Sequence, residues 1–180
     1  MSRRSVLQVG LYVGASAALG SIFVASEAFG ADALKPFLGA YKFVGGKKEI
    51  AARDKAIEEA VAGIGALFRG VARDMLRAAN EIPEKIAIET KKQSLTVKAD
   101  DAPFTAPTDG SAVRVKVVTG DVMRMHYDIA SGQLDQIFEG DDRSRTNSFT
   151  KAKDKLLLEV TVTADALPKD LVYKLTYEPA

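Results

Sequence analysis

The sequence of 180 residues contains no cysteine, no tryptophan and only one histidine. Without cysteine the chain forms no disulfide, no thiolate metal site and no cysteine nucleophile, and it has no lipobox cysteine to carry a lipid. Its stability therefore has to come from an apolar core, and about 150 residues suffice for one such core.

An excess of charge of one sign is also missing. Residues 1–30 hold two of the 25 basic and one of the 24 acidic side chains, so 23 of each sign follow them. A protein that binds nucleic acid needs a basic excess to displace counterions from phosphates. We therefore expect no nucleic-acid partner.

The single histidine, His126, lies in a strand-like run where it shares a face with Arg124 and Asp128. The opposite face carries Met123, Met125, Tyr127 and Ile129, and this apolar set is the better candidate for the core. We therefore interpret His126 as a solvated side chain, and we predict no catalytic residue, no metal ligand and no cofactor. An enzyme that uses the polar face of this strand is the less favoured alternative.

The first 30 residues resemble a bacterial export signal. Arg3 and Arg4 precede an uncharged stretch, residues 5–26, rich in small and aliphatic side chains. Small residues near its end suit signal peptidase, and they place the mature amino terminus near Ala31. We expect a periplasmic or secreted protein, exported from a bacterial cytoplasm.

The route of export stays open. Residues 2–8, Ser-Arg-Arg-Ser-Val-Leu-Gln, follow the consensus of the twin-arginine pathway, but two arginines also serve ordinary Sec export. The uncharged stretch is close to the roughly 20 residues that span a bilayer, so an uncleaved anchor is a third interpretation. Membrane contact is expected only through this segment, if it is not removed.

Two periodicities divide the rest of the chain after a lead-in over residues 31–48, whose apolar part is an early strand or a clip over one end of the fold. Apolar residues recur at three, four and seven positions in residues 49–82, which predicts one or two amphipathic helices. Glycine lowers helix stability by about 1 kcal/mol, so we expect two helices with a break near Arg69 and Gly70.

Residues 83–180 alternate with a period of two. The runs separated by glycine-containing turns predict about eight short antiparallel strands. They cover residues 86–88, 95–97, 113–117, 123–127, 134–138, 143–150, 156–162 and 171–177. Closing such a meander on itself removes both sheet edges. The prediction is an α+β chain in which helices and barrel form one domain.

Helices followed by strands over residues 85–178, with the closing pattern of residues 167–177, resemble a lipocalin-like (calycin) barrel of bacterial exported proteins. The resemblance covers a little over half of the chain. The lipocalin G-x-W signature and disulfide are missing, and the helices come before the barrel, so no binding residue is transferred from that family. The resemblance implies binding of a small hydrophobic molecule.

A closed barrel of eight strands is either filled with side chains or holds one small ligand. If it is hollow, adaptable methionines and aromatic rings are candidates to line the ligand site. They are Met123, Met125, Tyr127, Phe138, Phe149, Leu158, Val160, Tyr173, Leu175 and Tyr177. We expect a non-enzymatic barrel for a small hydrophobic or lipid-like ligand. The alternative is a structural module with a filled core that docks on an envelope protein partner.

Overall fold

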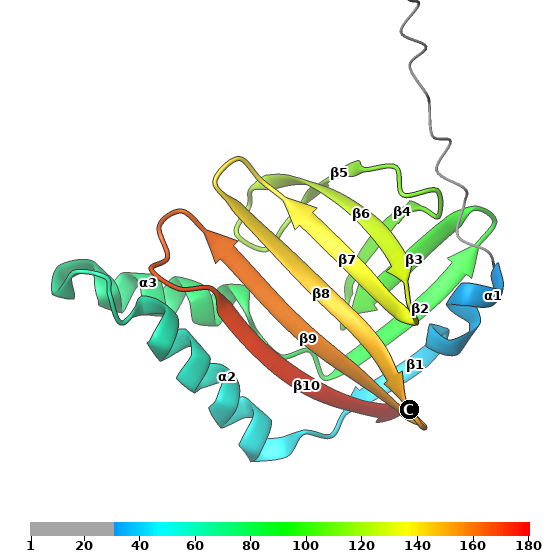
Figure 1. The fold of residues 1–180 in the computed structure, drawn as a ribbon, viewed down its shortest axis with the longest axis horizontal. Coiled ribbons are helices and arrows are strands. Elements are labelled where there is room, and N and C mark those ends of the chain that lie inside the picture. Colours follow the sequence, from blue (N-terminus) through cyan, green and yellow to red (C-terminus); the bar gives the residue numbers. More distant parts are fainter. Residues whose placement is uncertain (1–30) are drawn as a thin grey trace, which may run out of the picture.

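The computed structural model describes residues 31–180 (Figure 1). The predicted export signal and most of the region around the expected cleavage position lie outside the described residues. The helical segments are α1 (Ala31–Leu34), the short 3-10 turn η1 (Lys35–Phe37), α2 (Gly46–Val61) and α3 (Ala66–Ala79). The strands are β1 (Gly39–Phe43), β2 (Lys85–Lys91), β3 (Ser94–Ala99), β4 (Ala102–Pro107), β5 (Val113–Lys116), β6 (Val122–Ala130), β7 (Gln133–Glu139), β8 (Arg143–Ala152), β9 (Lys155–Ala164) and β10 (Leu171–Pro179).

The strands form one antiparallel sheet in the order β4-β3-β2-β1-β10-β9-β8-β7-β6-β5, and it curls into a nearly closed barrel (Figure 1). The predicted α+β class and barrel are confirmed, but the sheet has ten strands instead of about eight. The two additional strands are β1 and β4. Pro103 and Pro107 concealed β4 in the sequence, and they are tolerated there because β4 is at one end of the sheet.

The lead-in contributes to the sheet instead of preceding it. Strand β1 pairs with β2 through Gly39 to Lys42 and with β10 through Tyr41 to Phe43. The two helices α2 and α3 are therefore inserted between the first and second strands of the barrel. Because β1 joins the two ends of a meander that are distant in sequence, local patterning alone could not place it.

The break between the helices lies at residues 62–65, and the predicted break near Arg69 and Gly70 is wrong. Helix α3 runs through Gly70, whose missing side chain would meet no other atom. Gly63, by contrast, faces Pro168 so closely that an added Cβ would lie 3.0 Å from that ring. The close approach of the β9–β10 loop thus locates the break.

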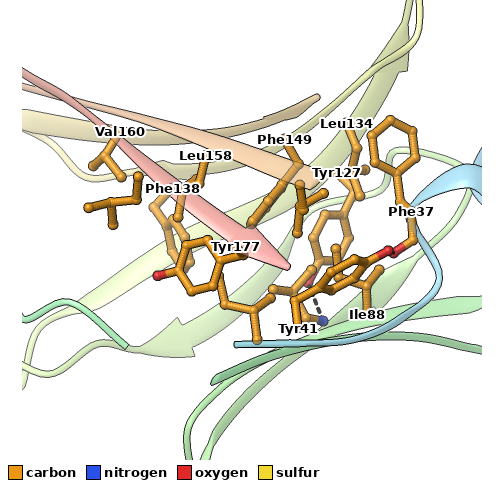
Figure 2. Packing of buried hydrophobic residues seen from close by; sticks show 14 of the residues in the cluster. Phe37, Tyr41, Ile88, Tyr127, Leu134, Phe138, Phe149, Leu158, Val160 and Tyr177 are labelled. Atoms are coloured by element: carbon orange, nitrogen blue, oxygen red, sulfur yellow. Dashed lines mark hydrogen bonds between the residues drawn. The ribbon is translucent and has the colours of Figure 1, made fainter. Parts of the chain in front are cut away.

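One end of the barrel is filled. Phe37 of η1 is 1% exposed, and the carbonyl of Phe37 accepts a 2.9 Å hydrogen bond from the Tyr41 hydroxyl. Figure 2 shows Phe37, Tyr41, Ile88, Leu134 and Tyr127 gathered at this end. Their rings and branched side chains leave this half of the interior solid.

The last two strands alternate as their sequence predicts. Leu158, Val160, Tyr173 and Leu175 are buried, which confirms the predicted inward face. A period of two predicts that Thr176, between Leu175 and Tyr177, points to solvent, but it is half-buried because helix α2 covers it. The Glu49 carboxylate accepts hydrogen bonds of 2.7 Å from both the backbone N–H and the hydroxyl of Thr176. The helix thereby covers part of a strand edge that β1 leaves unpaired.

Candidate ligand cavity

The opposite end of the barrel is hollow. A cavity of about 680 Å³ lies between the strands, the end of α3 and three loops, a volume within the range of small-molecule sites. The loops are the β3–β4 turn, the β5–β6 turn and the β9–β10 connection, which contribute Asp101, Val118 and Leu167 to the wall. The interior therefore contains both a packed core and a cavity, an arrangement between the two that the sequence left open.

The candidate lining residues fall into two groups. Seven of the ten lie on the cavity wall: Met123, Phe138, Phe149, Leu158, Val160, Tyr173 and Leu175. Met125, Tyr127 and Tyr177 are fully buried in the core but are not part of that wall. Figure 2 shows Val160, Phe138 and Leu158 apart from the cluster around Tyr41. Whether any of the ten contacts a ligand stays a prediction.

A belt of polar side chains crosses this apolar interior. Strand register places Tyr127 opposite Gln136, Gln136 opposite Asn147, Asn147 opposite Val160, and Val160 opposite Tyr173. One step toward the open end, Arg145 lies opposite Phe138 and Val162. Four of these five strands, β6, β7, β8 and β10, thus bring hydrogen-bonding side chains to one level of the barrel, and β9 contributes the apolar Val160.

Arg145, Asn147, Gln136 and Tyr127 form a continuous chain of hydrogen bonds. Arg145 Nε donates to Asn147 Oδ1 at 2.9 Å, Asn147 Nδ2 donates to Gln136 Oε1 at 2.9 Å, and Gln136 Nε2 donates to the Tyr127 hydroxyl at 3.2 Å. The Tyr127 hydroxyl accepts from Val97 N–H at 3.1 Å and donates to the Phe104 carbonyl at 2.7 Å. Burial raises the pKa of Tyr127, so the phenol stays protonated and able to donate.

Tyr127 closes the barrel where the backbone does not. Strands β4 and β5 are the two ends of the sheet order. The Tyr127 hydroxyl, carried by β6, reaches across to Val97 of β3 and Phe104 of β4. This side chain therefore ties β6, which lies next to one end of the sheet, to β3 and β4 at the other end.

Replacing Tyr127 with phenylalanine should lower the free energy of unfolding by about 1 to 3 kcal/mol, because the backbone groups of Val97 and Phe104 lose the hydroxyl that bonds both of them. Chemical denaturation measures this change. Tyr177→Phe is a matched control, since that hydroxyl makes one 3.1 Å bond, to the Pro83 carbonyl. An equal loss in both variants would contradict the role of Tyr127 as the closing contact.

Arg145 connects the cavity wall to helix α3. Its Nη1 donates to the Ala79 carbonyl at 2.9 Å and to Asn80 Oδ1 at 3.2 Å, and the Tyr173 hydroxyl donates to the same Asn80 oxygen at 3.2 Å. Arg53 binds the Asn80 carbonyl from the other side at 2.7 Å. These cations satisfy carbonyls at the carboxyl end of the helix, where positive charge is favourable.

The charge of Arg145 is not matched by an acid. Of the two arginines on the cavity wall, Arg143 pairs with Asp121 at 3.1 Å and Asp142 at 3.4 Å. No carboxylate of residues 31–180 forms an ion pair with Arg145, whose bonds all go to neutral oxygens. Glu81, Asp100 and Asp101 also line the cavity but form no ion pair with Arg145, so a negatively charged ligand group would supply the partner that this cation lacks.

Arg145, Asn147 and Gln136 were not among the residues predicted to line the site. The sequence predicted residues 143–150 only as one strand of the barrel. One signal was available, because Phe149 was taken as inward-facing and a period of two then turns Asn147 and Arg145 inward as well. Likewise Phe138 predicts an inward Gln136, which is 2% exposed.

Helix α3 covers the cavity but is loosely held. None of its residues is buried, and Leu67, Phe68, Val71 and Met75 are 58% to 82% exposed. The helix leans on α2 through Glu58, whose carboxylate is 2.6 Å from Arg73 Nε and 3.3 Å from Arg77 Nη2. The hydrogen bond from Arg73 lowers the pKa of Glu58, so this contact persists at neutral pH. Few contacts oppose a movement of α3 away from the barrel.

His126 lies on the outer face of β6, half-buried, while Met123, Met125 and Tyr127 point inward, which confirms the predicted faces of this strand. Within residues 31–180 no three side chains of the metal-binding types come together. None of the described helices is long and apolar enough to cross a membrane.

Comparison with known proteins places the fold. No family model and no curated protein matches the chain. Lipid binding protein 8 of Caenorhabditis elegans superposes with a TM-score of 0.52 at 12% identity, covering 82% of this chain and 97% of its own. The REP1-NXSQ fatty acid transporter gives a TM-score of 0.52 at 15% identity, with 81% and 97% covered. A secretary abundant heat soluble protein from Ramazzottius varieornatus gives 0.55 at 10% identity, with 81% and 96% covered. The fold of residues 31–180 is therefore that of the calycin-type barrels to which fatty-acid-binding proteins belong.

Proposed function

We propose that this protein is an exported, non-enzymatic barrel that binds a small hydrophobic molecule carrying an acid group. The observation that carries the proposal is a mainly apolar cavity of about 680 Å³ with one unpaired cation, Arg145, on its wall. Apolar surface would hold the body of the ligand, and a few polar groups would fix its orientation. Two proteins of the same fold support this, since they are named for lipid binding and fatty acid transport.

The route to the cavity follows from the loosely held helix. Met75 and Leu76 of α3 and Val118 of the β5–β6 turn lie on the cavity wall, and Met75 and Val118 are also largely exposed. We infer that the ligand enters between α3 and this turn. An apolar rim lets a poorly soluble ligand leave water gradually as it enters.

Filling the cavity should remove binding without removing the fold. Val160 is buried on β9 and lies on the cavity wall, so Val160→Phe places a larger ring in the space for the ligand. We expect the affinity for a fluorescent fatty-acid probe to fall about tenfold, the loss of roughly 1.4 kcal/mol, while the unfolding temperature is held.

The control for this experiment is Val172→Phe, which places the same ring on the outer face of β10, where Val172 is 45% exposed. It should bind the probe as the unchanged protein does. If Val160→Phe instead costs about 1 to 3 kcal/mol of stability, as overpacking does, and the unchanged protein takes up no probe, the binding proposal is wrong.

Export remains part of the proposal. The mature amino terminus should lie between Phe29 and Asp32, because small residues follow the apolar stretch only there. The intact mass of the protein from a periplasmic extract measures this. Retention of residues 1–28 on protein extracted from membranes would indicate an anchor instead of a cleaved signal.

A second candidate function rests on the exposed apolar residues of α3. Leu67, Phe68, Val71 and Met75 form an exposed apolar stripe on a helix without buried residues. Such a stripe suits contact with an envelope protein, the role of an interaction module. A photo-crosslinker at Phe68 tests this in cells; a protein that stays uncrosslinked and monomeric would count against it.

A further inference from the structure

The polar belt contains more hydrogen-bond donors than a plain alkyl acid can use. Arg145, Asn147, Gln136 and Tyr173 all lie on the cavity wall. An alkyl chain offers nothing to an amide, and a buried polar group without a partner is unfavourable. The polar belt therefore indicates that the ligand has hydrogen-bonding atoms in addition to its acid group.

The donors that have no partner can be counted. An amide nitrogen carries two N–H groups, but Asn147 Nδ2 and Gln136 Nε2 each make one bond, to Gln136 Oε1 and the Tyr127 hydroxyl. Arg145 uses Nε and Nη1, whereas its Nη2 donates to no atom of residues 31–180. Both phenol hydroxyls already donate, to Phe104 O and Asn80 Oδ1. What remains on the wall is a set of N–H groups that need acceptor oxygens.

The donors of Arg145, Asn147 and Gln136 lie next to one another on the cavity wall. The 2.9 Å bond from Arg145 Nε to Asn147 Oδ1 holds the guanidinium next to the amide of Asn147, and Gln136 follows directly. A ligand with two oxygens a few bonds apart could therefore accept hydrogen bonds from both places, one oxygen from the guanidinium and the other from the amides of Asn147 and Gln136. Gln136 is 2% exposed, so an oxygen at this level lies away from bulk water.

We propose that the ligand is an oxygenated lipid acid, a carboxylic acid with a hydroxyl or carbonyl oxygen on one of the carbons nearest the acid group. The inference rests on the proposed function. The carboxylate binds the Nη2 side of Arg145, and the second oxygen accepts from Asn147 and Gln136. A hydroxyl can also donate to a free lone pair of either amide oxygen. The deeper wall, with Phe149, Leu158 and Leu175, takes the alkyl chain.

Competition binding tests the class of ligand. Dodecanoic acid, β-hydroxydodecanoic acid and ω-hydroxydodecanoic acid displace a fluorescent fatty-acid probe, and their affinities are compared. We expect the β-hydroxy acid to bind about tenfold more tightly than dodecanoic acid, the size of about one net hydrogen bond. The ω-hydroxy acid should gain nothing, because its hydroxyl lies at the apolar end of the chain.

Variants assign the preference to the belt. Replacing both amides, Gln136→Leu with Asn147→Leu, removes both partners of the amide–amide bond, and it also removes the oxygen that accepts from Arg145 Nε. The preference is therefore measured within each variant, as the ratio of the affinities for β-hydroxydodecanoic and dodecanoic acid, and in the double variant it should disappear. Gln136→Leu alone should reduce the preference and serves if the double variant is unstable. Thr146→Val, on the outer face of the same strand as Asn147, is the control and should keep the preference.

The outcomes separate the two proposals. If none of the acids displaces the probe, or the probe does not bind, the proposed function itself is wrong. If dodecanoic and β-hydroxydodecanoic acid bind equally well, the free N–H groups are satisfied in another way and the inference is overturned. A preference that survives in both amide variants would also overturn it.

Discussion

Replacing Arg145 with glutamine is expected to weaken the binding of a long-chain carboxylic acid about 10- to 100-fold, the size of a hydrogen-bonded charge contact. Arg145 has no ion pair with residues 31–180 and lies on the cavity wall beside Asn147. A ligand carboxylate would supply the missing anion. Titration of a fluorescent fatty-acid probe, or calorimetry with dodecanoic acid, measures the change.

Two controls separate the charge of Arg145 from its contact with α3. Dodecanol has the same chain without the charge, and its affinity should change much less in the Arg145→Gln variant. Arg53→Gln removes another cation from Asn80, at the same end of α3, but Arg53 is not part of the cavity wall. If Arg53→Gln weakens acid binding as strongly, the effect arises from the helix and Arg145 is not the anchor of the acid.

Two leucines on one strand should respond differently to truncation. Leu156→Ala is expected to lower the free energy of unfolding by about 3 to 5 kcal/mol, because Leu156 is fully buried in the solid half of the barrel. Leu158, two residues further along β9, lies on the cavity wall and is 4% exposed. Leu158→Ala should cost only about 2 kcal/mol, since part of that side chain already faces open space.

Urea unfolding measures this difference. The two free energies are comparable if the dependence of the unfolding free energy on urea concentration is the same in both variants. The comparison is controlled internally, because strand, residue type and substitution are the same. Equal losses would mean that the cavity closes around its wall in solution, which would argue for a filled core and against the binding proposal.

The periodicity of the sequence predicted much of the fold. Alternation with a period of two located eight of the ten strands, and it assigned the inward faces of β6, β9 and β10. The change to a period near 3.6 located α2 and α3. These elements are predictable because each buries one face, so that the core imposes its pattern on neighbouring residues.

The remaining elements were hidden for two different reasons. The lead-in was left open between a strand and a clip, and only its pairing with β2 and β10 identifies β1, whereas β4 directly follows β3 and was concealed by Pro103 and Pro107. The helix break near Gly63 reflects the approach of Pro168 from the β9–β10 loop. No local pattern contains information about a neighbour that is over 100 residues away.

For the site, the sequence by itself determined that the interior of a barrel is the place where a ligand could bind, and it named seven residues of the cavity wall. It also determined that residues 31–180 carry equal numbers of acidic and basic side chains and that cysteine chemistry is absent. Only the tertiary structure decided that one end is filled by Phe37 and Tyr41 while the other is hollow, because volume depends on how side chains from distant strands meet. The register likewise decided that Arg145, Asn147 and Gln136 meet at one level, since a period of two gives the inward face of each strand but not which residues of neighbouring strands lie opposite one another.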